Sequence, residues 1–299
     1  IENKSCIMVT VEESPLKPHV AHGRPFIRVG PTTRKLSREQ YDILLQQRMN
    51  GYGFDYQACQ KATLDDIDSE GVYQFLEVAN SVRNLNENIM LPLDMILMKL
   101  GLMQDNSDLT RAALLLFGKK PQLFFEGSYE IKVGDFPDNQ GYDTLLNDQE
   151  FNGTLINNFH SCISFVLKAI RYQSRKNDVI RQNDYDLPIE ALREALVNMI
   201  VHRDYRQSIK STVEVRPASV NFYNPAHLFG PAITIKNLTK RHPSRPGNKL
   251  ISKIFYLMGL FENWGGGTLK ICESMKNAGR ADPVFSFADG MFSLALPRE

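Results

Sequence analysis

Three polar side chains at steps of four are the residues of this sequence best suited to chemistry. Glu194, Asn198 and His202 lie in the segment Glu190–Tyr205, and at 3.6 residues per turn such a row stays on one helix face, drifting by about 40° per step. A carboxylate can polarise a water molecule, and carboxamide oxygens are Mg²⁺ ligands, as phosphate hydrolysis requires. The spacing fits equally well an amphipathic helix whose polar residues are solvated.

A run of three glycines is the second candidate. Gly265, Gly266 and Gly267 come directly before a helix expected over Thr268–Ala278, and the free N–H groups of a helix start favour anions. A flexible turn explains the same run without a ligand. The functional hypothesis is that the acid, the amide and the glycines face one hollow, with room for a phosphorylated ligand.

The elements that would position these residues are a helix, a strand pair, two helices and a hairpin. Asp186 is expected to cap the first helix, with Pro188 in its first turn and its end near Arg203. The apolar stripe of that helix comprises Ile189, Leu192, Leu196, Met199 and Ile200. The following elements are expected at Val213–Tyr223 with a turn at Pro217–Ala218, at Leu250–Met258, at Thr268–Ala278, and at Val284–Phe287 paired with Met291–Leu296.

The first half of the chain mixes strands and helices. A hairpin is expected from Cys6–Val11 and Phe26–Val29, followed by a polar loop at Gly30–Lys35. Ser37 and Gln40 have the spacing of a capping box that opens a helix. Further helices are expected within Leu64–Leu102 and along Phe159–Ile170, with a strand at Tyr129–Val133.

Three segments together resemble a bacterial family of RecG-related ATP-dependent helicases or transcriptional regulators. They are Tyr185–Tyr205, Asn224-Pro225 and Met258–Gly267. The C-terminal domain of that family is classed with the GHKL ATPases of gyrase, MutL and histidine kinases. The resemblance implies a general base at Glu194, a Mg²⁺ ligand at Asn198 and ATP as cofactor. It also places His202, Arg245 and Gly265, Gly266 and Gly267 at the nucleotide.

One segment departs from that superfamily. Where its members carry an Asp-x-Gly-x-Gly box that reads the adenine, this sequence has Phe222–Leu228, with neither Asp nor Gly, and Val201 stands where an acid is usual. Two alternatives therefore stay open, a working nucleotide site and a fold that has kept the shape and lost the nucleotide.

The segment Gly23–Arg34 and the helix after it are similar to the end of an AlbA/Schlafen-type DNA-binding domain. The resemblance implies contacts with DNA phosphates, and the basic and hydroxyl side chains of this region can make them. The candidate residues are Arg24, Arg28, Thr32, Thr33, Arg34, Lys35 and Arg38. The alternative is a solvated turn whose arginines pair with nearby acids.

A second basic stretch lies between Arg203 and Lys253. It holds ten basic residues against two acidic ones, a local charge of +8 in a chain of net charge +1. If several of these cations share a face, they would meet a polyanion such as DNA. In the family this stretch takes the place of the ATP lid, so the same cations, Arg245 among them, could clamp a triphosphate.

Composition excludes several classes of protein. The longest apolar run, Ala112–Phe117, is far shorter than the roughly 18 to 20 residues of a membrane span, and no signal segment opens the chain. A cytoplasmic protein with no membrane partner is expected. The four cysteines form no CxxC pair, which argues against zinc and disulfides. Without GxxxxGK[ST], no helicase motor is expected.

The expected fold class is α+β. The domains are a truncated AlbA/Schlafen-like part over 1–62, a central α/β connecting region over 63–183 and a GHKL-like α/β sandwich over 184–299. The chain is interpreted as a fragment whose relatives continue into a winged helix, and as a homodimer. The preferred function is a DNA-binding transcriptional regulator that binds ATP–Mg²⁺. The alternatives are an ATP-hydrolysing enzyme acting on nucleic acid and a non-catalytic scaffold.

Overall fold

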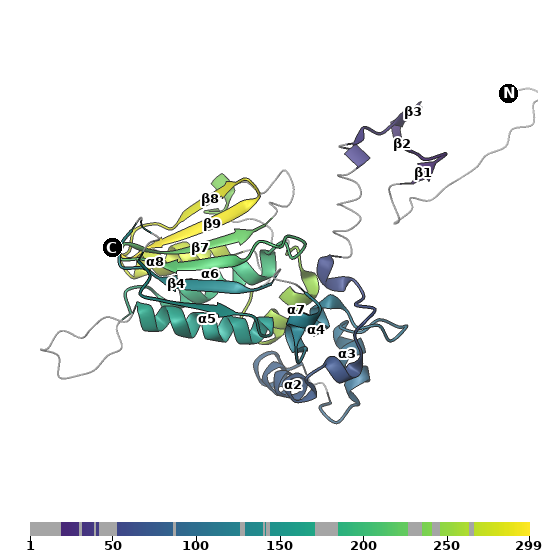
Figure 1. Cartoon of the computed structure of the whole chain (residues 1–299), viewed down its shortest axis with the longest axis horizontal. Coiled ribbons are helices and arrows are strands. Elements are labelled where there is room, and N and C mark those ends of the chain that lie inside the picture. The colour runs from purple at the N-terminus through teal and green to yellow at the C-terminus, as the bar shows by residue number, and fades with distance from the viewer. Residues whose placement is uncertain are drawn as a thin grey trace, which may run out of the picture. The chain divides into compact units, whose positions relative to one another are not determined.

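The chain divides into two compact units, Ile1–Gly53 and Phe54–Glu299 (Figure 1). The expected boundaries at 62/63 and 183/184 remain predictions. The structure, a computed structural model, describes residues 19–29, 32–38, 40–41, 53–85, 88–125, 129–139, 141, 144–170, 185–226, 235–240, 246–262 and 266–299.

The first unit contains a three-stranded antiparallel meander. Its strands are β1 (Val20–Ala21), β2 (Arg24–Val29) and β3 (Thr32–Lys35). The polar loop expected at Gly30–Lys35 is therefore wrong for its last four residues. The adjacent β-branched side chains of Thr32 and Thr33 favour extended backbone, and polar side chains do not prevent a strand whose faces are both exposed. The strand expected at Cys6–Val11 lies outside the described residues.

The capping box after β3 is confirmed. The Gln40 backbone N–H donates to Ser37 Oγ and the Ser37 backbone N–H donates to Gln40 Oε1, both at 3.1 Å. Each side chain thus satisfies a backbone donor that the first helical turn leaves free.

The second unit is built on a six-stranded sheet. Its strand order is β5-β4-β6-β7-β9-β8, with β4 and β6 parallel and all other neighbours antiparallel. The bounds are β4 Ile131–Asp135, β5 Asn147–Phe151, β6 Ser211–Val215, β7 Ser219–Pro225, β8 Val284–Ala288 and β9 Met291–Pro297. The strand pair with its turn and the C-terminal hairpin are confirmed.

Edge strand β5 was not predicted. Four of its five side chains are polar and exposed, and only Phe151 is buried, so it lacks the alternation of a half-buried strand.

Helices α5, α6 and α8 lie on one side of this sheet (Figure 1). The helices of the second unit are α2 Ser69–Arg83, α3 Leu93–Leu100, α4 Arg111–Phe117, α5 Leu155–Ala169, α6 Ile189–His202, α7 Lys249–Leu257 and α8 Gly267–Asn277. The expected mixed α+β class is confirmed. None of the helices in the described part of the chain has the length and apolar character needed to cross a bilayer.

Helix α6 presents its apolar stripe to the core as expected. Leu192, Leu196 and Ile200 are all buried, which fixes the rotation of α6 and hence the direction of its polar residues. The expected cap is wrong: Pro188 occupies the N-cap position. The Asp186 carboxylate instead accepts hydrogen bonds from the Arg298 guanidinium.

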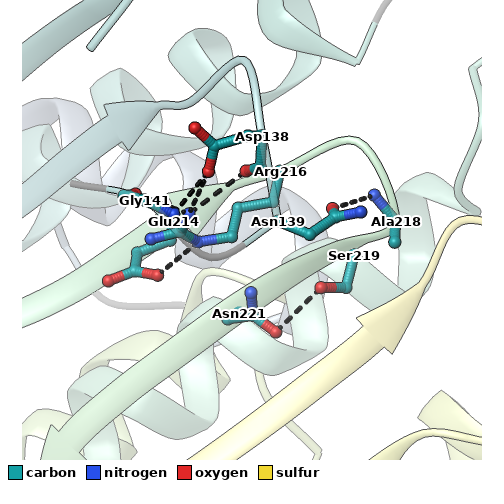
Figure 2. A network of polar contacts seen from close by, with 8 residues as sticks. All are labelled: Asp138, Asn139, Gly141, Glu214, Arg216, Ala218, Ser219 and Asn221. Atoms are coloured by element: carbon teal, nitrogen blue, oxygen red, sulfur yellow. Dashed lines mark hydrogen bonds and ion pairs between the residues drawn. The ribbon is translucent and has the colours of Figure 1, made fainter. Parts of the chain in front are cut away.

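One end of the sheet is tied down by Arg216, which follows β6. Its Nε donates to Glu214 at 2.8 Å, and its Nη1 donates to the carbonyls of Asp138 and Gly141 at 3.1 and 3.0 Å (Figure 2). Its guanidinium also stacks on the Phe136 ring at 4.2 Å. Arg216 thereby fixes the segment after β4 against the β6–β7 turn.

Helix α7 is capped by a residue almost two hundred positions away. The buried Asp55 carboxylate accepts the backbone N–H groups of Leu250 and Ile251 at 2.6 and 3.2 Å. Burial raises the pKa of Asp55 to about 6, against the lowering effect of these hydrogen bonds. This contact anchors the short helical turn η1 (Phe54–Tyr56) to the start of α7.

Candidate functional site

The acid of α6 and the start of α8 meet at a glycine. A Cβ built on Gly267 would lie 2.2 Å from Glu194 Oε1 and 3.2 Å from Asn198 Nδ2. Any larger residue at position 267 would require the Glu194 side chain or one of the two helices to shift, because real Cβ atoms do not come within 3.0 Å of such atoms. The structure therefore brings Gly267 to Glu194 and Asn198, which precede it by 73 and 69 residues in sequence.

The acid and the amide are joined by a hydrogen bond. Asn198 Nδ2 donates to Glu194 Oε1 at 3.0 Å. The amide nitrogen is thus turned toward the carboxylate, which leaves the amide oxygen of Asn198 on the other side as a candidate ligand for a hard cation.

The carboxylate of Glu194 lies in a closed environment. The residue is 4% exposed, and burial is the main cause that raises its pKa. The nearby Lys270 and the Asn198 hydrogen bond act in the opposite direction, whereas the charge of Glu262 adds to the rise. A carboxylate with a raised pKa is better suited to accept a proton from water than an exposed one.

The N-terminus of α8 offers donors beside this carboxylate. Gly266 is its N-cap and carries no side chain to cap the first-turn N–H groups, and a Cβ on Gly266 would meet nothing within 4 Å. Uncapped N–H groups at a helix N-terminus suit an oxyanion such as phosphate. Oxygen donors on Asn198 and Glu194 suit Mg²⁺, so the residues present fit a Mg²⁺–phosphate group.

The other nucleotide residues expected from sequence are placed as follows. His202 is the last residue of α6, two turns beyond Glu194 and so about 12 Å along the helix axis. Gly265 and Arg245 lie outside the described residues.

Sequence reasoning missed two charged residues that act on Glu194. Lys270 stands in the first turn of α8, where its proximity to the glycine run was a usable signal. Glu262 precedes that run by a few residues and had no such signal, because its effect on Glu194 depends on how the loop folds.

Asn224, at the end of β7, makes hydrogen bonds within the protein core. Asn224 is 2% exposed, its Nδ2 donates to the Met199 carbonyl of α6 at 2.9 Å, and its Oδ1 accepts from Ser211 at 2.7 Å. This residue binds β7 to α6 and β6, so its polar atoms are directed to the core.

The basic residues of the first unit lie on a small hairpin. Phe26 pairs with Lys35 and Arg28 pairs with Thr33 across β2 and β3. Because alternate residues and direct cross-strand partners share a face, Arg24, Phe26, Arg28, Thr33 and Lys35 lie on one face. We call this face the basic hairpin face. Arg34 and Thr32 lie on the opposite face, while Arg38 follows the hairpin in the helical turn.

The second basic stretch does not form one patch among the described residues. Arg203 is buried and donates to Ser211 and the Ile209 carbonyl. Lys210 pairs with Glu130 and Glu150. Further pairings join Arg206 to Asp204, Arg216 to Glu214, and Lys253 to the Leu100 carbonyl. Lys210 is thus paired with two acids from outside the stretch, whereas Asp204 and Glu214 are already counted in its local charge of +8.

No group of three or more His, Cys, Asp or Glu side chains suited to a metal ion occurs in the described part of the chain. A Mg²⁺ ion at Asn198 would take most of its coordination from water and phosphate oxygens.

Two family descriptions match separate parts of the chain. Residues 210–296 match the family described as "Putative ATP-dependent DNA helicase recG C-terminal". Residues 43–126 match a domain of unknown function, DUF8451. The first match begins after α6, so Glu194 and Asn198 lie outside it. Among curated proteins, nothing matches the chain.

A solved structure shares the fold. The crystal structure of the DIP2311 protein from Corynebacterium diphtheriae superposes with a TM-score of 0.62 at 20% sequence identity. The match covers 92% of this chain and 45% of that one, so the chain spans less than half the length of this structural relative. With the sheet, the helices and the family match, the C-terminal part of the chain is similar to RecG-related, ATPase-like domains.

Proposed function

We propose that the second unit binds ATP–Mg²⁺ between α6 and the start of α8. The observation that carries this proposal is the approach of Gly267 to Glu194 and Asn198. It places the N-terminus of α8 beside an acid and an amide that are one turn apart on α6. Its setting beside a region similar to ATPase-like domains adds support. Gly265, His202 and Arg245 are included as expected contributors.

Asn198, Glu194 and the N–H groups at the start of α8 would have different roles in this site. Asn198 would hold Mg²⁺ through its amide oxygen, and the N–H groups at Gly266 and Gly267 would bind phosphate oxygens. Bound Mg²⁺ would supply charge neutralisation on the phosphates. Glu194 would accept a proton from the attacking water, a role for which its burial and raised pKa are suited.

Phosphate release from ATP tests the role of Glu194. Glu194→Gln keeps the size of the side chain and removes the base, so we expect a fall of at least about 100-fold in the rate. Glu190→Gln is the matched control, because Glu190 is an exposed glutamate one turn earlier on α6. Unchanged release in Glu194→Gln would refute the base role. ATP that binds without release would favour a regulator over an enzyme.

We also propose that the first unit binds DNA through the basic hairpin face, as part of an AlbA/Schlafen-like domain in a transcriptional regulator that acts as a homodimer. The support is the shared face of Arg24, Arg28 and Lys35, together with Thr33, which already accepts a hydrogen bond from Arg28 at 3.0 Å. Arg34 and Thr32, on the opposite face, and Arg38, in the turn that follows, would add weaker attraction to the duplex without direct phosphate contacts. The cations would bind phosphates and so position the duplex.

The salt dependence of DNA binding tests this second part. Each phosphate contact steepens the log–log slope by about 0.9, so Arg28→Gln and Lys35→Gln should each reduce the slope by about that amount. Arg34→Gln, on the opposite face, is the control and should change it less. Equal effects of all three variants would refute the assignment to one face.

A further inference from the structure

Arg83, the last residue of α2, binds the loop that leads into the glycine run. Its Nε donates to the Tyr256 carbonyl at 3.0 Å, and its Nη2 donates to Glu262 Oε1 at 2.9 Å. The guanidinium lies 4.2 Å over the Tyr256 ring. One side chain from the region similar to DUF8451 thus contacts both the last turn of α7, at Tyr256, and the segment after it, at Glu262.

The neighbouring side chain of α2, Val82, packs against the same loop. A Cβ on Gly259, whose φ is +72°, would lie 2.7 Å from Val82 Cγ1. The turn after α7 therefore packs directly on the end of α2, and it reverses the chain with a conformation that favours glycine. Arg83 and Val82 together fix where Met258–Glu262 lies.

This loop connects to the candidate site by a short path. Glu262 is only four residues before Gly266, and its charge acts on Glu194. The start of α8 meets the same carboxylate at Gly267, so Glu262 and the start of α8 both act on Glu194. Arg83 touches neither the acid nor the glycines.

We propose that Arg83 is a positioning residue of the nucleotide site: its guanidinium holds the loop Met258–Glu262 and thereby sets the glycine-bearing start of α8 against Glu194 and Asn198. The expected effect of Arg83 on nucleotide affinity rests on the proposed nucleotide function. Its expected effect on the order of the loop rests only on the contacts of Arg83. It makes α2 a part of the site, so that the region of unknown function acts on nucleotide binding.

Two variants separate positioning from general stability. Arg83→Gln removes the charge, the ring contact and most of the hydrogen bonds. Arg111→Gln is the matched control, because Arg111 also stacks on an aromatic ring, that of Phe54, at 4.4 Å, and also belongs to the region 43–126. Thermal unfolding of both variants shows whether their losses of global stability are similar.

Hydrogen exchange is measured first, in the absence of nucleotide. We expect Arg83→Gln to speed exchange in peptides covering residues 257–270 by about tenfold, the effect of losing charged hydrogen bonds, with Arg111→Gln unchanged there. Trp264, the single tryptophan of the chain, lies in this segment of the sequence and gives a second signal by its fluorescence. Unchanged exchange and fluorescence in Arg83→Gln would overturn the proposal.

Nucleotide affinity is measured next, with a non-hydrolysable ATP analogue and Mg²⁺. We expect about tenfold weaker binding by Arg83→Gln than by the wild type or Arg111→Gln. Equal affinities would overturn the link from loop to site. If the wild type binds no analogue, the proposed nucleotide function fails, whereas the exchange result still decides whether Arg83 holds the loop.

Discussion

The contact between Gly267 and Glu194 makes a prediction that compares two adjacent glycines. In Gly267→Ala, the new Cβ would lie 2.2 Å from Glu194 Oε1, and ordinary contact begins at 3.4 Å. The atoms must therefore separate by 3.4 − 2.2 = 1.2 Å. Either α8 moves away from α6, or the buried carboxylate rotates and loses its 3.0 Å hydrogen bond with Asn198.

The expected cost is about 2 kcal/mol. Overpacking costs about 1–3 kcal/mol, and a lost hydrogen bond to a charged group costs about as much. The better helix propensity of alanine offsets up to about 1 kcal/mol. For Gly266→Ala, nothing lies within 4 Å of the new Cβ, and φ is −106°, so we expect a change within about 0.5 kcal/mol.

Chemical and thermal unfolding give the measurement. The difference between the two variants corresponds to a lower melting temperature for Gly267→Ala by about 4–8 °C in a unit of this size. Adding Glu194→Ala removes the atom that the new Cβ meets, so the double variant should recover stability relative to the sum of the single changes. Equal stability of Gly266→Ala and Gly267→Ala would refute the reasoning.

Three further predictions concern other parts of the molecule. Asp55 has a folded pKa of about 6 against an ordinary 3.8, so its contribution to stability is full below the lower value and is lost as pH rises through about 6. The free energy of unfolding of the wild type relative to Asp55→Asn should therefore fall by up to about 3 kcal/mol between about pH 4 and pH 8; a constant difference would contradict the burial of this charge. Arg216→Gln should destabilise the second unit by about 3 kcal/mol in urea unfolding, because it leaves Glu214 and two carbonyls without their buried partner; a loss below about 0.5 kcal/mol would show that this network is not structural. Arg28→Gln should lower the salt slope of DNA binding by about 0.9, and an unchanged slope would exclude a phosphate contact there.

Much of the second unit could be predicted from periodicity. The stripe of α6 and the C-terminal hairpin follow directly from apolar spacing, and the spacing of Glu194 and Asn198 correctly indicated a shared face. Strand β5 has no such pattern, because four of its five residues are polar and exposed. Its place at the edge of the sheet, paired only with β4, allows that composition.

The contacts that complete the site could not be predicted, because they join distant segments. The sequence around Arg83 does not indicate that it binds Glu262, and the sequence around Asp55 does not indicate that it caps α7. The surroundings of Lys210 could not be predicted for the same reason: its acidic partners Glu130 and Glu150 lie outside the basic stretch and reach it only in the folded chain.

Calorimetric titration of the wild type with a non-hydrolysable ATP analogue tests the central claim most directly. The account predicts saturable binding at one site per chain in the presence of Mg²⁺, and marked weakening in Asn198→Ala, which loses the amide oxygen. No heat from the wild type at millimolar analogue, or equal binding by Asn198→Ala, would contradict a nucleotide site between α6 and the start of α8.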